Sequence, residues 1–181
     1  MRRIFLLTLV CLLVVSGCRR WPDWYAPPAQ RQSFEDAEPP AVAAAMFRMN
    51  QADVSQYLVK DVANGPEGAE WRWVFKRPEL RFLIQDAGSL CFFMDFAIAE
   101  ATFRQTGPVR FTLFINNQLF KTFRFDRHGQ MQLLTPVPSA LLKPCAVNQV
   151  AIDVDPVWVA PSDGAKLGFV LSSAGFRKCQ Q

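Results

Sequence analysis

From residue 57 onward, large apolar residues recur at every second position, in short runs separated by turn-forming residues. Period-two alternation is typical of β-strands, because successive side chains point to opposite faces of a sheet. The longest such run places five apolar residues on one parity: Leu90, Phe92, Met94, Phe96 and Ile98. The opposite parity of this run is also mostly apolar, which predicts a central strand covered on one face and half-covered on the other.

Other runs with strand character lie before and after this one, at residues 57–62, 71–76, 80–84, 109–115, 119–125, 131–137, 150–154 and 167–171. Turn clusters such as Asn64–Gly68 and Asp126–Gly129 lie between them. About eight strands at regular spacing, without a long helix, predict an all-β fold of the antiparallel β-sandwich class, jelly-roll-like in its order. With 50% hydrophobic and 20% charged residues, the chain has enough apolar side chains for such a core.

One hairpin register can be predicted in detail. Phe111 and Phe123 share a face if Asn116–Gln118 form a three-residue loop, which pairs Ile115 with Leu119. A two-residue loop would place these apolar rows on opposite faces, because a slip of one residue reverses every side chain. We therefore expect the three-residue loop, with a left-handed residue at its second or third position.

The first 17 residues have the pattern of a signal peptide. Arg2 and Arg3 precede an apolar run at residues 4–15, which is too short for a spanning helix of about 20 residues. The run ends in Val15-Ser16-Gly17-Cys18, which resembles the bacterial lipobox. The resemblance implies cleavage before Cys18, acylation of its thiol and of the new amino terminus, and a membrane anchor. An ordinary secretory signal cut near Gly17 is the alternative.

Residues 18–45 are predicted to form a lipid-anchored, proline-rich tether, and residues 46–178 the β-sandwich domain. Prolines at positions 22, 27 and 28 favour an extended spacer. Arg19, and not an aspartate, follows Cys18. By resemblance to the sorted lipoproteins of two-membrane bacteria, this implies the periplasmic face of the outer membrane. The whole chain also resembles envelope lipoproteins of unassigned function, through Tyr25–Pro28 and Asp163–Phe169.

The folded part resembles galactose-binding-like and carbohydrate-binding sandwiches, through residues 71–73, 109–116, 148–152 and 166–169. This resemblance spans about residues 57 to 176 and implies a non-catalytic module that binds envelope glycan or another carbohydrate. A structural or adaptor lipoprotein that docks a protein assembly in the envelope is the alternative.

Candidate ligand residues are aromatic rings that can stack on sugars and polar side chains at predicted strand or loop ends. Trp158 lies in a predicted loop and is the favoured platform, whereas the parity of Trp71 and Trp73 favours the core. The polar candidates, Asn148, Asp163 and Lys166, can hydrogen-bond to hydroxyl groups. The same surface can bind a protein, because tryptophan is common in binding hot spots.

Catalytic and metal-binding patterns are weak. His128 is the only histidine and lies in a predicted turn, without a nucleophile elbow or a Cys-x-x-Cys pair elsewhere. Asp153 and Asp155 share a strand face and, with Asp95, leave a glycoside hydrolase as a remote alternative. We expect no catalytic residues, metal or cofactor.

The charge pattern gives no indication of nucleic-acid binding. Cleavage of the leader removes two arginines from the 20 basic residues, and the remaining 18 against 16 acidic residues leave a charge of +2. The basic residues are scattered instead of clustered on one face, so no long-range attraction for a polyanion is expected.

Export permits a disulfide. With Cys18 assigned to lipid, three cysteines remain beyond the leader, enough for one bridge. We favour Cys145–Cys179, because both lie at the same end of a hairpin if the strands that they flank pair antiparallel. Cys91 lies within a strand and fits a buried thiol, and a bridge that includes it is the alternative.

Overall fold

A computed structural model describes residues 44–66 and 68–179. The predicted signal peptide, Cys18 and nearly all of the predicted tether lie outside these residues. None of the described helices is long and apolar enough to cross a bilayer.

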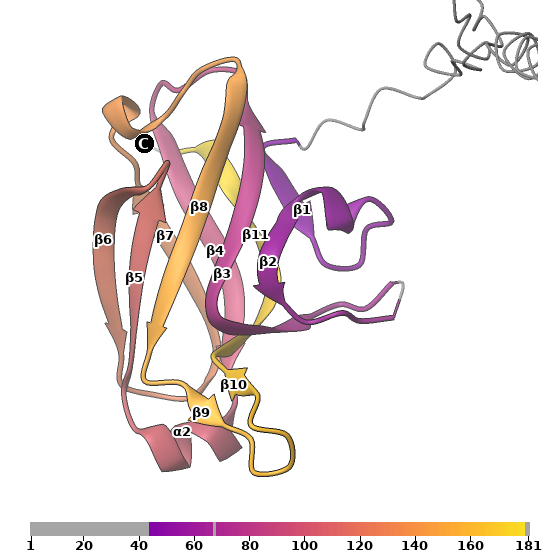
Figure 1. The fold of residues 1–181 in the computed structure, drawn as a ribbon. Helices are drawn as coiled ribbons and strands as arrows, with labels where there is room; N and C mark the ends of the chain where they lie inside the picture. The colour runs from indigo at the N-terminus through magenta and orange to yellow at the C-terminus, as the bar shows by residue number, and fades with distance from the viewer. Residues whose placement is uncertain (1–43, 67, 180–181) are drawn as a thin grey trace, which may run out of the picture. The chain divides into compact units, whose positions relative to one another are not determined.

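The described chain forms an antiparallel β-sandwich (Figure 1). Its strands are β1 (Met46–Arg48), β2 (Leu58–Val62), β3 (Arg72–Ile84), β4 (Leu90–Ile98), β5 (Val109–Ile115), β6 (Gln118–Phe125), β7 (Gly129–Pro136), β8 (Ala146–Asp155), β9 (Trp158–Val159), β10 (Lys166–Leu167) and β11 (Phe169–Lys178). Its helical elements are α2 (Glu100–Thr106) and the 3-10 turns η1 (Val54–Gln56) and η2 (Ser139–Leu141).

The hydrogen-bonded strand order is β6-β5-β8-β3-β11-β4-β7, and β3 connects the two layers. Residues 72–74 of β3 pair with β11, whereas residues 79–84 pair with β8. Pro78 lies between these two stretches, where a residue without an N–H group removes no ladder hydrogen bond. Strands β6, β5 and β8 therefore form one layer, and β11, β4 and β7 form the other. The sequence predicts two strands where the structure has this single long one.

Phenylalanine rings fill the space between the layers. Phe111, Phe169 and Phe96 are at most 2% exposed, and the ring centroids of Phe111 and Phe169 are 4.6 Å apart. The even-numbered row of β4 faces this core, as its alternation predicts, with Leu90 and Ile98 at its two ends. Burial of large rings is the main source of stability in such a core.

The β5–β6 hairpin has the predicted face but a different loop. Phe111 pairs with Phe123 as expected. The turn, however, consists of Asn116 and Asn117 alone, with φ values of 50° and 66°, as in the two-residue turns that match strand twist. An extra residue, Phe120, bulges out of β6 where the register shifts. The bulge reverses the parity that the shorter loop would otherwise impose.

Helix α2 was not predicted from the sequence. It follows β4 directly and ends at Gly107, whose φ of 72° suits a residue without a side chain. Glu100 in its first turn and Arg104 in its last complement the helix dipole. These end signals are present in the sequence, but the helix is short and continues an apolar strand.

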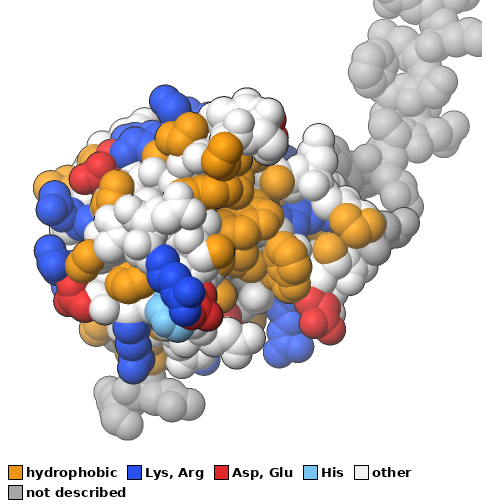
Figure 2. Space-filling model, turned by 90° about the horizontal axis from the view of Figure 1, so that it is seen from below, with side chains coloured by type: hydrophobic (Ala, Val, Ile, Leu, Met, Phe, Trp, Pro, Cys, Tyr) orange, Lys and Arg blue, Asp and Glu red, His pale blue; other side chains and the backbone are white. Residues whose placement is uncertain are grey.

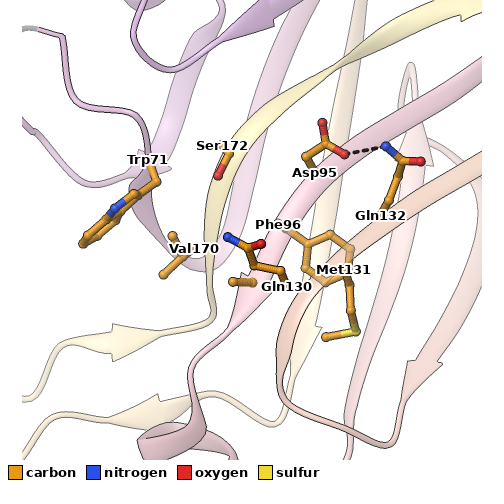
Figure 3. Close-up of a pocket in the computed structure, with 9 residues that line it drawn as sticks. Trp71, Asp95, Phe96, Gln130, Met131, Gln132, Val170 and Ser172 are labelled. Carbon is orange, nitrogen blue, oxygen red and sulfur yellow. Dashed lines mark hydrogen bonds between the residues drawn. The ribbon is translucent and has the colours of Figure 1, made fainter.

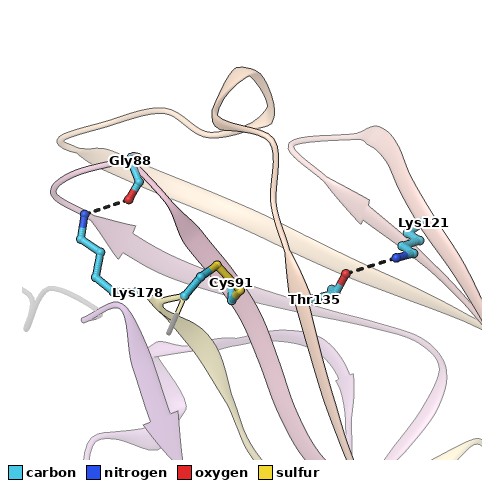
Figure 4. The surroundings of a disulfide bond; sticks show 6 residues. Gly88, Cys91, Lys121, Thr135 and Lys178 are labelled. Atoms are coloured by element: carbon cyan, nitrogen blue, oxygen red, sulfur yellow. Dashed lines mark hydrogen bonds between the residues drawn. A yellow bond between two sulfur atoms is a disulfide. The ribbon is translucent and has the colours of Figure 1, made fainter. Parts of the chain in front are cut away.

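Cys91 and Cys179 form the disulfide, which corrects the predicted Cys145–Cys179 bridge (Figure 4). Cys91 lies near the start of β4 and Cys179 follows β11, and these two strands pair antiparallel with Arg177 opposite Cys91. The strand that follows Cys145 is β8, which pairs with β3 and β5 and not with β11. Cys145 is therefore separated from β11 by β3, and its exposed thiol lies 3.4 Å from the Gln85 carbonyl oxygen.

A charged contact lies beside the disulfide. The Lys178 ammonium donates to the Asp86 carboxylate. It also donates to the Gly88 carbonyl oxygen at 2.8 Å (Figure 4). The hydrogen bond from Lys178 and that from the Gly88 N–H hold the pKa of Asp86 below its ordinary value. Both charged side chains are largely exposed, so the disulfide is the stronger link between this end of β11 and β4.

Candidate functional site

A hollow of about 600 Å³ lies on the outer face of the β11-β4-β7 layer (Figure 3). Ligand pockets typically have volumes of about 300 to 1,000 Å³. The residues that line the hollow include Trp71, Asp95, Gln130, Met131, Gln132, Val170 and Ser172. Strand register brings them together, because Asp95 pairs with Gln132, and Ala97 pairs with both Gln130 and Val170.

Two hydrogen bonds fix the carboxylate in the hollow. Gln132 Nε2 donates to Asp95 Oδ1 over 2.7 Å, and Ser173 Oγ donates to Asp95 Oδ2 over 2.7 Å. A carboxylate oxygen can accept more than one hydrogen bond, and an amide group both donates and accepts. Gln130 and Gln132 are exposed. The hollow therefore offers positioned donors and acceptors of the kind that hydroxyl groups bind.

Trp71 forms a wall of this hollow and precedes β3. Its side chain is 52% exposed, so the prediction that it faces the core is wrong. The inward row of β3 is the even-numbered one and begins at Val74, which is fully buried. Trp73 lies on the opposite parity, pairs with Val170 and is half-buried. The bulk of the two tryptophans suggested the wrong face for the core.

The remaining predicted ligand residues do not join this hollow. Trp158 lies in β9 and is half-buried, and its Nε1 donates to Gln105 Oε1 over 2.9 Å. Lys166 lies in β10, paired with β9, and Asp163 lies in the connection between them, where its Oδ1 accepts the Ala165 N–H. Both are exposed. These residues gather at the end of the sandwich that holds α2 (Figure 1).

Asn148 lies near the other end of β8 and is fully buried. Its Oδ1 accepts from Asn116 Nδ2 at 2.8 Å and from the Lys143 N–H at 2.7 Å. Its Nδ2 donates to the carbonyl oxygens of Lys143 at 2.8 Å and Ala146 at 3.0 Å. All four side-chain positions for hydrogen bonds are used internally, which leaves none for a ligand and makes Asn148 a structural residue.

The catalytic alternatives are not assembled into a site. Asp153 and Asp155 lie on β8 with Lys76 Nζ at 3.4 and 4.0 Å from their carboxylates, whereas Asp95 is in the other layer. His128 is exposed, with its ring centroid 5.9 Å from that of Phe103. Within residues 44–66 and 68–179, no group of three or more His, Cys, Asp or Glu side chains is placed to hold a metal ion.

Sequence reasoning named Trp71 and Asp95 but did not place them in one site, and it missed Gln130, Gln132 and Ser173. The available signals were a single carboxylate in an otherwise apolar strand face and the alternation of the two glutamines around Met131. These residues come together because β4 pairs with β7. The two strands are separated in sequence by α2 and the β5–β6 hairpin.

No protein-family model matches the sequence, and no curated protein is similar to it in sequence. Among solved structures, a family 35 carbohydrate-binding module from Clostridium thermocellum is 8% identical at a TM-score of 0.44, over 75% of this chain and 100% of that one. A carbohydrate-binding module of Cellvibrio mixtus lichenase 5A, in complex with cellotriose, is 14% identical at a TM-score of 0.39, over 77% and 100%.

A family GH115 4-O-methyl-α-glucuronidase is 12% identical at a TM-score of 0.40, over 76% of this chain, which spans only 18% of that enzyme. All three TM-scores lie below 0.5. Similarity at this level identifies no ligand for this chain.

Proposed function

We propose that the domain is a non-catalytic carbohydrate-binding module and that its ligand lies in the hollow on the β11-β4-β7 layer. The observation that carries the proposal is that the exposed Trp71 ring lines the same hollow as the hydrogen-bonded Asp95 and Gln132 side chains. A flat amphipathic ring can stack on the apolar face of a sugar. The carboxylate accepts from sugar hydroxyls, and the glutamine amides both donate to them and accept from them.

Trp71→Ala is expected to weaken glycan binding by about tenfold or more, equivalent to about 1.4 kcal/mol, because the stacking surface is lost. The mature chain with Cys18→Ser, made as a soluble protein, is screened on a glycan array. Affinity for the best ligand is then measured by isothermal titration calorimetry. Folding is checked by circular dichroism, and it should not change because Trp71 is exposed.

Trp158→Ala is the matched control, since it removes the same ring outside the hollow. It is expected to retain glycan affinity, whereas Gln132→Ala should lower it. Glycan binding that is lost with Trp158→Ala but not with Trp71→Ala would place the ligand at the β9–β10 end. Failure to bind any glycan would reject the proposal.

The proposal includes a lipid anchor at Cys18 that holds the module at the periplasmic face of an outer membrane. Its support is the sequence alone, through the leader and Val15-Ser16-Gly17-Cys18. A protein acylated in this way binds membranes strongly, because each buried methylene contributes about 0.8 kcal/mol.

Cys18→Ser is expected to abolish incorporation of an alkyne-labelled fatty acid and to move the protein from the membrane fraction to the soluble fraction. Both changes follow from loss of the only thiol at the lipobox position. Cys11→Ser is the control, because Cys11 lies within the apolar run and should leave labelling unchanged. Labelling of the Cys18→Ser protein would contradict the anchor.

One observation favours the adaptor function as a second candidate. Hydrophobic side chains gather on the end of the sandwich viewed in Figure 2, and Val159 in β9 is 52% exposed. Exposed apolar patches often mark protein interfaces. Under this alternative, Val159→Glu would disrupt co-purification with an envelope protein and leave the β11-β4-β7 hollow unchanged.

A further inference from the structure

A second hollow, of about 390 Å³, adjoins the first at β7. Its lining consists of Arg124 and Phe125 at the end of β6, Asp126 and Arg127 in the following turn, and Met131 and Gln132 of β7. Met131 and Gln132 also line the first hollow. A ligand with more than one sugar ring can therefore extend from Trp71 across β7 to the arginines.

The charges in this second hollow are not balanced. Arg124 Nε donates to Asp126 Oδ1 over 2.8 Å, so the charges of these two side chains offset each other. Arg127 has no ion pair or hydrogen bond through its side chain to any residue in the described part of the chain. Arg110, which lies opposite Arg124 in the strand register, also lies opposite Asp155, so Arg127 is the positive charge in this hollow that lacks a partner among the described residues. An anion bound here would pair with Arg127.

We infer that this second hollow is a subsite for a sugar carboxylate, so that the module selects an acidic glycan that contains uronic acid residues. The planar guanidinium group of Arg127 can donate two parallel hydrogen bonds to a carboxylate. The hollow beside Trp71 takes a neighbouring ring through stacking and hydroxyl contacts. The inference rests on the proposed carbohydrate-binding function and adds the class of ligand.

The test compares acidic polysaccharides with their methyl esters, which keep the sugar skeleton and remove the charge. Polygalacturonate, alginate and hyaluronate, each in both forms, are the probes for the mature Cys18→Ser chain in affinity electrophoresis and biolayer interferometry. At least one acid is expected to bind, and its esterification should weaken binding by about tenfold. Binding of the acid should also weaken as salt rises, because screening reduces the attraction.

Arg127→Gln is expected to weaken binding of the acid to about the level of the ester, a loss of roughly tenfold, without altering binding of the ester. Lys166→Gln is the matched control, because it removes one exposed positive charge that lines neither hollow. It should leave the preference for the acid intact.

The outcomes separate this inference from the proposal on which it rests. Trp71-dependent binding that is equal for an acid and its ester overturns the carboxylate subsite and leaves the carbohydrate-binding function standing. Acid binding that is unchanged in Arg127→Gln also overturns the subsite. The absence of binding to every neutral and acidic glycan overturns both.

Discussion

Replacing Cys91 and Cys179 together with alanine is expected to lower the free energy of unfolding by about 4 kcal/mol, within the usual range of 2 to 5. The two cysteines are 88 residues apart in sequence, so the bridge closes a long loop in the unfolded chain. A loop of that length loses much conformational entropy when it is cross-linked, and this raises the free energy of the unfolded state. Removal of the bridge is therefore expected to act mainly on the unfolded state.

The measurement is urea denaturation of the mature Cys18→Ser chain, followed by circular dichroism with and without reductant. Cys145→Ala is the control, because Cys145 is exposed and unbridged among the described residues, and its stability should change by less than about 0.5 kcal/mol. In the unreduced protein, one thiol should react with a thiol reagent, and Cys145→Ala should remove that reaction. A destabilised Cys145→Ala variant with a new reactive thiol at Cys91 would restore the pairing that the sequence suggested.

Local patterns predicted most of the strands and the buried face of several of them, although not that of the start of β3. The even-numbered row of β4 is the clearest case, because five large apolar residues in period two have few alternatives to a buried strand face. The pairing of Phe111 with Phe123 was also predictable, because both residues lie close to their turn. The loop was not, because a bulge at Phe120 and a shorter turn give the same register as a longer loop without a bulge.

Long-range pairing could not be predicted from the same patterns. Cys145 precedes β8 and Cys179 follows β11, yet β3 lies between these strands, and no local signal in either strand reveals that neighbour. The candidate site depends on the same kind of information, since Asp95 and Gln132 meet only through the pairing of β4 with β7. Residue type alone identified Trp71 as a ligand candidate, but side-chain bulk gave the wrong face.

Asn148 was predicted to bind a ligand because of its polar side chain, but in the structure that side chain is used within the fold. Asn148→Ala is therefore expected to lower the free energy of unfolding by about 3 kcal/mol. The substitution removes four hydrogen bonds from a side chain that is fully buried. The Lys143 N–H loses its acceptor, and the Lys143 and Ala146 carbonyl oxygens lose a donor. Buried polar groups without partners cost more than the hydrogen bonds themselves contribute.

Asn148→Asp tests the role of the amide donor separately. The carboxylate keeps the acceptor oxygen but replaces the donating nitrogen with a second oxygen, which faces the Lys143 and Ala146 carbonyl oxygens that the amide nitrogen contacts in the native protein. The variant is expected to be at least as unstable as Asn148→Ala at neutral pH, because a buried charge without a partner is costly. Acidification that protonates the carboxyl group restores one donor, so the difference from the native protein should shrink at low pH.

Asn64→Ala is the matched control, because Asn64 is exposed in the connection between β2 and β3, and its stability should change by less than about 0.5 kcal/mol. Urea denaturation gives the stabilities, and titration with the best glycan gives the affinities. If Asn148 instead held the ligand, Asn148→Ala would leave the unfolding midpoint unchanged and lower glycan affinity. The hydrogen bonds around Asn148 predict a loss of stability without a direct effect on glycan contacts. The side chain links the connection between η2 and β8 to Asn116 in the β5–β6 turn, and it lines neither hollow of the proposed site.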